Sequence, residues 1–246
     1  MKKIIKKFVK SLLSHNQYFA LHFFWFRIMG GGDAEMYLVS SLVKKRDRFL
    51  DIGSNVGIYT YFFSNKFSHI DSFEPLTEIT ARIKELNREN IEIHNIALSN
   101  CESNLTFYIP IIDGKSATSR ASLETQEAPF EERRVEVRTL DSFDFTDVDL
   151  IKIDVEGHEY SVLEGSLLTL QRCKPILLLE IEQRHISRPI EEVFGLVLRQ
   201  GYDGFFLFER SLVSLSQFSY ETHQLPFLDL TSSDSYINNF IFIPRD

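Results

Sequence analysis

The residues of this chain with the clearest chemical potential lie in a glycine-rich turn. Residues 49–57 read FLDIGSNVG, which predicts an apolar strand, a tight turn and then a helix. Gly53 permits the turn and the close approach of a ligand, while Gly57 lets the helix pack closely on the strand. A single turn of this kind is often only a connection between elements, but the pattern is also typical of a site for a nucleoside-containing cofactor.

The charges near this turn distinguish between nucleoside cofactors. Asp51 ends the predicted strand, and the glycines are spaced GxxxG rather than GxGxxG. The carboxylate would repel the pyrophosphate of a dinucleotide but would attract the ammonium group of S-adenosylmethionine, directly or through water. Glu74 ends the next predicted strand, where an acid can accept hydrogen bonds from both ribose hydroxyls. A lone Glu is usually solvated, so the cofactor prediction depends on both features together.

The third predicted strand ends where the topology would bring the adenine ring. Asn95 and Ala97 follow this strand, and the Asn95 amide could donate to or accept from the adenine edge. An Asn at a strand exit is also a common turn former. Binding of adenine and formation of a turn are therefore two alternative interpretations of Asn95.

A second group of ionisable residues follows another apolar strand. Asp154 and Glu156 lie two apart on an extended segment, so both side chains can point to one face, and His158 opens the next helix. Three roles compete for them: general base, metal ligand, or a charge that is favourable at a helix start. His158 is the first candidate for the base because the ordinary pKa of histidine lies near neutrality.

A third acidic strand end completes the candidate site. Glu180 and Glu182 face the same side and could join Asp154 around a hard cation such as Mg²⁺, which prefers oxygen ligands. Asp154, Glu156 and Glu180 could equally orient the base. Glu is also common at exposed strand ends, so the metal remains an optional part of the prediction.

The elements that must position these residues alternate between strands and helices. Five parallel strands are predicted: Arg48–Ile52, His69–Phe73, Ile91–Asn95, Leu150–Asp154 and Ile176–Ile181. The helices expected between them are Val56–Asn65, Pro75–Glu89 and His158–Leu170. Two further strands, Gly204–Phe208 and Asn239–Ile243, are expected to form an antiparallel closing pair. This order predicts an α/β fold with a doubly wound, mostly parallel, seven-stranded sheet and helices on both faces.

Two segments depart from this alternation. Residues 104–140 read as a hairpin-like insertion within a domain that spans 32–246. Residues 1–31 form a basic, aromatic extension, and its first part, 2–13, has the apolar spacing of an amphipathic helix with lysines on the other side. Such a helix could bind an anionic membrane surface or pack on its own domain.

Composition limits the partners and the compartment. The formal net charge is −8 and there are two cysteines, Cys101 and Cys173. A general electrostatic grip on nucleic acid is therefore not expected, and neither is a disulfide framework. We expect no signal peptide and no transmembrane helix, and a cytoplasmic location, at the inner face of the membrane if the helix over 2–13 binds lipid. The oligomeric state is not indicated.

The chain resembles the FkbM family of S-adenosylmethionine-dependent methyltransferases. The resemblance extends from about residue 32 to 182, with a weaker echo in NFIFIP at 239–244. It is carried by DIGSNVG at 51–57, FEP at 73–75, NIALS at 95–99, TLD at 139–141, DVEGHE at 154–159 and VLEG at 162–165. The combination is far more specific than any one of these motifs.

The resemblance implies a class I, Rossmann-like methyltransferase fold and O-methylation, commonly of a sugar or natural-product hydroxyl in glycan or related biosynthesis. The residues that it places around the cofactor are Asp51, Gly53, Ser54, Asn55, Gly57, Glu74, Pro75, Asn95, Ala97 and Asp154. Ser54 stands where the family usually has Ala, and Glu182 where many members carry His. The acceptor itself is not implied, because family members differ widely in substrate.

Three alternatives stand beside the methyltransferase prediction. An NAD(P)-dependent oxidoreductase could use a similar sheet, although the spacing of the glycines and Asp51 disfavour it. A noncatalytic membrane-surface binding module would use the lysine helix but would leave the acidic strand ends unexplained. A nucleic-acid methyltransferase is disfavoured by the negative charge and by the absence of an Asn-Pro-Pro-Tyr motif or a Pro-Cys nucleophile.

Overall fold

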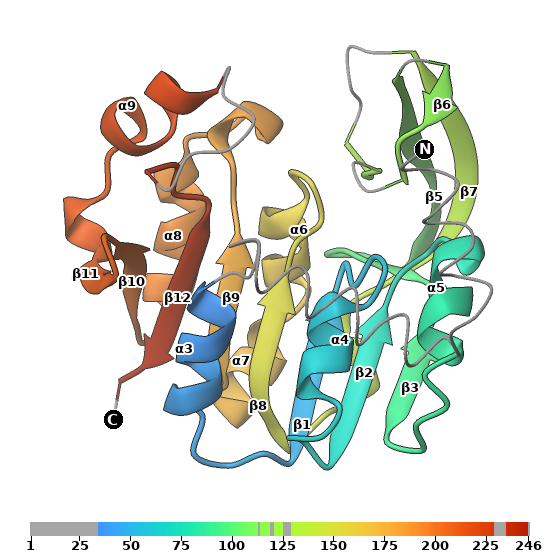
Figure 1. The fold of residues 1–246 in the computed structure, drawn as a ribbon, viewed down its shortest axis with the longest axis horizontal. Coiled ribbons are helices and arrows are strands. Elements are labelled where there is room, and N and C mark those ends of the chain that lie inside the picture. The colour runs from blue at the N-terminus through green and yellow to red at the C-terminus, as the bar shows by residue number, and fades with distance from the viewer. Residues whose placement is uncertain (1–33, 113, 119–120, 125–128, 229–234, 246) are drawn as a thin grey trace, which may run out of the picture.

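The computed structural model describes residues 34–112, 114–118, 121–124, 129–228 and 235–245. Its centre is a single sheet of strand order β11-β10-β12-β9-β8-β1-β2-β3 (Figure 1). The strand bounds are Arg48–Ile52 (β1), His69–Phe73 (β2), Ile91–His94 (β3), Val148–Ile153 (β8), Ile176–Glu180 (β9), Tyr202–Phe208 (β10), Ser211–Ser214 (β11) and Asn239–Pro244 (β12). The extension over 1–31 and its lysine helix lie outside the described residues.

The five predicted parallel strands are confirmed: β1 and β2 have the predicted bounds, and the ends of β3, β8 and β9 shift by one or two residues. They pair in parallel in the order β3-β2-β1-β8-β9. A parallel pair needs a crossover connection, and right-handed crossovers by helices place a layer on each face of the sheet. The carboxyl ends of all five strands therefore meet along one edge.

Helices cover both faces, as the sequence predicts. Their bounds are Ala34–Leu42 (α3), Ile58–Phe63 (α4), Thr77–Lys84 (α5), Glu159–Glu164 (α6), Leu167–Cys173 (α7) and Ile190–Leu198 (α8), with a short α9 at Tyr220–His223. On one face α3 and α4 pack on side chains such as Phe49 and Leu150. On the other, α6, α7 and α8 pack on the alternate side chains, such as Leu50 and Ile151. Successive side chains of a strand point to opposite faces of the sheet, so strands such as β1 and β8 contribute to both apolar clusters.

The single helix predicted over His158–Leu170 is two helices. Gly165 lies between α6 and α7, and a Cβ there would come within 2.0 Å of the carbonyl oxygen of Ser99. The Asp141 carboxylate accepts hydrogen bonds from the amides of Leu168 and Thr169, which start α7. The close approach at the glycine and this new N-terminal partner separate the two helices.

The closing strands are antiparallel as predicted, but the sheet has eight strands rather than seven. β12 pairs antiparallel with both β9 and β10. The additional strand β11 forms a hairpin with β10, and the two connecting residues, Glu209 and Arg210, have φ angles of 47° and 63°. Two-residue hairpin turns with positive φ are usually marked by Asn-Gly or Asp-Gly. The Glu-Arg pair carries no such signal, so the sequence did not indicate this strand.

A second, smaller sheet rises beside the carboxyl ends of β2 and β3 (Figure 1). Its long hairpin consists of Ser103–Ile112 (β5) and Phe130–Arg138 (β7), which lie in the segment expected as an insertion. The short strands Ala97–Leu98 (β4) and Lys115–Ser116 (β6) complete it. Phe107 and Val137 of the hairpin pack in one cluster with Leu76 and Ile79 at the start of α5. The hairpin is thereby fixed to the edge of the main sheet at which the parallel strands end.

No helix in the described part of the chain is long and apolar enough to span a membrane.

The backbone segments that follow β1 and β8 are in close contact. The amide of Asp154 donates to the carbonyl of Ile52, the last residue of β1. Gly53, which follows Ile52, donates its amide to the carbonyl of Phe73. Gly53 has φ of +74°, and a Cβ on it would lie 1.8 Å from the carbonyl oxygen of Asp154. Only glycine fits both the backbone angle and this space.

We expect Gly53→Ala to lower the free energy of unfolding far more than Gly114→Ala. Gly114 has φ of +71° with no atom within 4 Å of an added Cβ, so it isolates the cost of the backbone angle. That cost is about 1–2 kcal/mol, whereas the added collision at Gly53 should bring the loss above about 4 kcal/mol. Urea denaturation followed by circular dichroism measures both. Equal losses would show that the contact with Asp154 relaxes freely.

Candidate functional site

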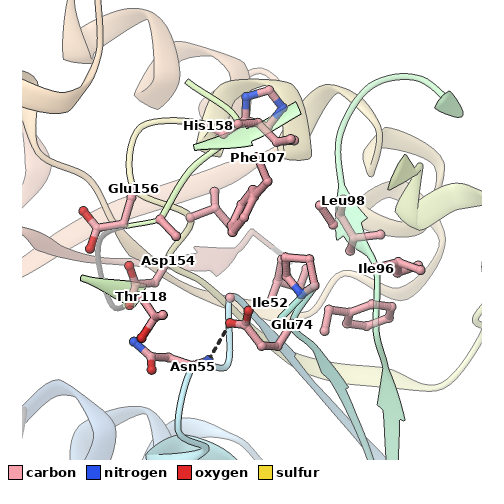
Figure 2. Close-up of a pocket in the computed structure, with 17 residues that line it drawn as sticks. Ile52, Asn55, Glu74, Ile96, Leu98, Phe107, Thr118, Asp154, Glu156 and His158 are labelled. Carbon is pink, nitrogen blue, oxygen red and sulfur yellow. Dashed lines mark hydrogen bonds between the residues drawn. The ribbon is translucent and has the colours of Figure 1, made fainter. Parts of the chain in front are cut away.

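A pocket opens at the carboxyl ends of β1, β2 and β8, between the main sheet and the hairpin (Figure 2). Together with its mouth, which is open to solvent, it holds about 570 Å³ of empty space. The lining residues are Ile52, Gly53, Asn55, Phe73, Glu74, Pro75, Ile96, Ala97, Leu98, Phe107, Thr118, Ala121, Leu123, Asp154, Val155, Glu156 and His158. Figure 2 shows acidic Asp154 and Glu156 on one side and apolar Ile96 and Leu98 on the other.

The structure brings most of the predicted site residues to this pocket. From the cofactor set, those that line it are Gly53, Asn55, Glu74, Pro75, Ala97 and Asp154. From the catalytic set, those that line it are Asp154, Glu156 and His158. The segments in question are far apart in sequence and meet because parallel strands end at one edge of the sheet.

Glu74 is held in place by the backbone. One carboxylate oxygen accepts from the amide of Asn55 at 3.2 Å and the other from the amide of Leu76 at 3.0 Å; Figure 2 marks the first bond. The side chain is almost fully buried, and burial raises the pKa of Glu74 to about 7 in spite of these two hydrogen bonds. A buried carboxyl in a fixed orientation is suited to receive a pair of ligand hydroxyls.

Four predicted cofactor residues do not line the pocket. Ser54 accepts a hydrogen bond from the Ser72 hydroxyl, and a Cβ on Gly57 would meet Ile83 at 2.7 Å, so both support the turn from behind. The Asn95 amide donates to the Thr80 hydroxyl and to the carbonyl of Glu74 rather than facing the adenine side. Its neighbours along the chain provide the apolar wall instead. The fourth is Asp51.

Asp51 points to the α4 face of the sheet. It is fully buried, and one oxygen accepts from both the amide and the hydroxyl of Thr60 at 2.9 and 2.6 Å. Its other oxygen has no hydrogen-bond partner among the described residues. Burial raises the pKa of Asp51, partly offset by the charge of Lys152. Direct contact with a cofactor ammonium, as the sequence suggested, is therefore not provided by this orientation.

Lys152 had no role in the prediction from the sequence. It lies beside Asp51 in the register of β1 and β8, and its ammonium is 2.7 Å from the Asp154 carboxylate. Burial alone would lower the pKa of Lys152, but the charges of Asp154, Asp51 and Glu180 raise it above the usual value. The available signal was a lone lysine in an apolar strand, because buried lysines occur almost only with partners.

A strained loop carries Glu156 to the pocket wall. Glu156 has φ of 53°, unusual for a residue other than glycine, and Gly157 follows with φ of 100°. A Cβ on Gly157 would lie 2.3 Å from the carbonyl oxygen of His185. The His185 Nδ1 is 3.1 Å from a Glu156 carboxylate oxygen. Such backbone strain persists where the surroundings hold it, often at functional sites.

The environment of His185 favours its charged form. Burial lowers the pKa of His185. The hydrogen bond to Glu156 and the charges of Glu156 and Glu182 raise this pKa by more than burial lowers it, so the net shift is upward. The sequence analysis assigned no role to this histidine. Its pairing with Glu156 joins two strand ends and could not be read from spacing alone.

His158 lines the pocket, and both of its ring nitrogens contact protein groups. Its Nε2 lies 2.9 Å from the Ser99 hydroxyl and its Nδ1 lies 2.7 Å from the Glu124 carboxylate. Both ring nitrogens are thus engaged by the protein. A base must present a lone pair to the proton that it removes, so His158 would have to exchange its Ser99 contact for the substrate before it could act as the predicted base.

The predicted Mg²⁺ ligands do not fit a metal site. Each is already engaged: Asp154 with Lys152, Glu180 with Asn238, and Glu182 with Arg184 and Tyr236. Within the described part of the chain, their oxygens do not gather into a group of three within 4.8 Å of one another. Glu180 also does not line the pocket. We derive no step through a metal ion.

One other group of potential ligands lies in the described residues, away from the pocket. Asp71, Glu92 and His94 place a ligand atom each within 4.8 Å of one another. Asp71, however, already binds the Arg48 guanidinium through one oxygen and His94 through the other, at 2.8 Å. With a permanent cation in contact, this group is an ion-pair network between strands rather than a cation site.

Comparisons with known proteins agree with this geometry. The model of the methyltransferase FkbM domain matches residues 51–203. The chain belongs to the FkbM methyltransferase family. The family prediction from the sequence motifs is confirmed, and the match spans the turn after β1, the hairpin, the Glu156 loop and β9. No curated protein sequence matched the chain.

Two of the solved structures that are similar to the chain are methyltransferases. Methyltransferase FkbM from Methylobacillus flagellatus KT has a TM-score of 0.53 and 14% identity, over 80% of this chain and 43% of that one. The chain thus spans less than half the length of that relative. A TehB-like SAM-dependent methyltransferase from Corynebacterium glutamicum ATCC 13032 Kitasato has a TM-score of 0.47 and 12% identity, over 94% of this chain and 99% of that one.

Glu159, which follows the pocket residues, provides a pH-dependent prediction. It is fully buried; one oxygen accepts from the amides of Val155 and Gly157, and the other has no hydrogen-bond partner in the described residues. Burial raises the pKa of Glu159 to about 7. At pH values between the ordinary pKa of glutamate and about 7, Glu159 keeps its proton in the folded state but has lost it in the unfolded chain. The free energy of unfolding therefore falls as pH rises through this range.

We expect Glu159→Gln to gain stability relative to the wild type as pH rises from 5 to 8. The variant keeps an acceptor for both amides but has no proton to lose, and the difference should grow by up to about 3 kcal/mol. Thermal unfolding at each pH measures it, with the exposed Glu191→Gln as the matched control. A difference that stays constant with pH would contradict the assignment of the buried proton to Glu159.

Proposed function

We propose that the protein is an S-adenosylmethionine-dependent O-methyltransferase that acts on a hydroxyl of a sugar, a glycan or a related natural product. The observation that carries the proposal is the order of groups along one pocket. A glycine turn, a fixed buried carboxyl and an apolar wall are followed by a loop of acidic residues. Membership of a methyltransferase family gives this order its chemical meaning.

The pocket residues fit the parts of this cofactor. The turn at Gly53 packs on the Asp154 carbonyl and has no side chain to keep a ligand from its backbone, and with Asn55 and Asp154 it suits the amino-acid end. Glu74 would hold the ribose hydroxyls. The wall formed by Phe73 and residues 96–98 suits a flat adenine ring. When bound there, the cofactor would supply an electrophilic methyl group on a positively charged sulfur.

The chain's own contribution is to position the acceptor and to take its proton. Glu156 lines the pocket and is paired with His185. Because His185 can itself gain or lose a proton, this pair is suited to proton transfer. As the new carbon–oxygen bond forms and the carbon–sulfur bond breaks, the hydroxyl proton would pass to Glu156. His185 would share the resulting charge change through its hydrogen bond. Asp154 is held by Lys152 and would orient rather than accept.

The charge of the pocket also limits the acceptor. Glu74, Asp154 and Glu156 all line it, and the described lining residues include no lysine and no arginine. Phosphorylated acceptors would therefore be repelled, and neutral or cationic hydroxyl compounds fit better.

The first test is ligand binding. We expect S-adenosylhomocysteine to bind the purified protein and NADH not to bind, as measured by calorimetric titration. Glu74→Ala should weaken the first affinity by about tenfold or more, because it removes charged hydrogen bonds to the ribose. Glu89→Ala, an exposed residue, is the matched control. Binding of NADH alone would replace the proposal by a nicotinamide-dependent oxidoreductase.

The second test is turnover. With neutral sugars and glycosides as acceptors, the wild type should convert S-adenosylmethionine to S-adenosylhomocysteine and form a methyl ether visible by mass spectrometry. Glu156→Gln should lower kcat by about 10²–10⁴ while the affinity for S-adenosylhomocysteine stays within twofold. An unchanged kcat would exclude Glu156 as the base, and methylation only at nitrogen or carbon would exclude the O-methyltransferase.

A further inference from the structure

The four residues 121–124, here called the roof segment, form a bridge between the hairpin and the Glu156 loop. Ser122 is fully buried and exchanges two backbone hydrogen bonds with Tyr108 of β5, at 2.8 and 3.0 Å. Its hydroxyl donates to the carbonyl oxygen of Val155 at 3.2 Å. The segment is therefore tied to both sides of the pocket at a single serine.

The roof segment contributes directly to the pocket wall. Ala121 and Leu123, on either side of Ser122, both line the pocket. They belong to one apolar cluster with Leu105 and Phe107 of the hairpin and with Ala97, which also lines the pocket. A ligand at the apolar end of the pocket would thus be able to contact both the wall at Ala97 and this segment.

His158 joins the roof segment to the opposite wall. Its Nδ1 meets Glu124, the last residue of the segment, and its Nε2 meets Ser99, which directly follows the wall strand β4. The imidazole is only 11% exposed, whereas the Glu124 side chain is 49% exposed. The hydrogen bond from His158 holds the pKa of Glu124 below its usual range. Because His158 also contacts Ser99, the Glu124 carboxylate is placed to fix the roof segment to the part of the pocket that follows β4.

We propose that the roof segment is part of the cofactor site and that Glu124 is the positioning residue that holds it closed through His158. His158 is then a binding residue at the adenine end of the pocket rather than a proton acceptor for the substrate. This inference rests on the proposed cofactor. It assigns a function to the insertion, namely to enclose the adenine ring against the wall at residues 96–98.

The inference predicts the rate at which the cofactor product leaves. We expect Glu124→Ala to raise the dissociation rate of S-adenosylhomocysteine by about tenfold, the equivalent of one charged hydrogen bond. Glu124→Gln keeps an acceptor for the ring N–H and should have a smaller effect. Stopped-flow displacement measures the rates, with Glu132→Gln, an exposed residue of the same hairpin, as the matched control. A Glu124→Ala rate equal to that of the wild type would overturn the proposal.

A double-mutant cycle separates the closing role of His158 from a catalytic one. His158→Asn should raise the dissociation rate as Glu124→Ala does, and the double variant should be no faster than either single variant, because both break one link. Independent, multiplicative increases would contradict the link. An unchanged dissociation rate in His158→Asn would return His158 to the general-base hypothesis.

Hydrogen exchange distinguishes failure of this inference from failure of the proposed function. In the protein without ligand, Glu124→Ala should speed exchange of the amides of residues 122–124, relative to the wild type and to Glu132→Gln. Unchanged exchange would overturn the role of Glu124 as the residue that holds the segment. If the wild type does not bind S-adenosylhomocysteine, the proposed cofactor is wrong, while the exchange result still decides whether Glu124 fixes the segment.

Discussion

A buried ammonium group among carboxylates organises the functional edge of this protein. Lys152 lies between Asp51 on β1 and Asp154 at the end of its own strand, beneath α4. Its charge permits two acids to stay at neighbouring strand ends inside the protein, where either alone would be costly to bury. The fixed position of Asp154 in turn places its carbonyl against Gly53, so that the glycine turn and the acidic loop share one boundary.

The site is built in layers around this ion pair. Behind the pocket, Asp51, Thr60 and the serines at 54 and 72 form a buried network that secures the turn to α4. On the pocket wall, Glu74 and Glu156 are each held by their own partners, backbone amides in one case and His185 in the other. In the proposed function, binding and proton transfer fall to different carboxyl groups with different surroundings, Glu74 almost fully buried and Glu156 partly exposed to water.

Much of the fold could be predicted because it depends on local patterns. The apolar runs gave β1 and β2 with correct bounds, and the glycine turn and Glu74 are placed at the pocket as expected. The orientation of Asp51 follows from alternation along β1, since Ile52 lines the pocket and its neighbour must face the other side. The contacts of His158 could not be predicted, because its partners at 99 and 124 come from elements whose packing no spacing rule specifies.

The hairpin also influences the order in which the molecule assembles. β5 and β7 pair through residues close in the chain, whereas β1 and β8 join segments roughly a hundred residues apart, and local pairs close with less loss of chain entropy. The hairpin can therefore form while the central strands are still apart. The pocket becomes complete only when β8 docks beside β1 and brings the Val155 carbonyl to Ser122, so a ligand that fills the pocket would depend on this long-range contact as well as on the hairpin.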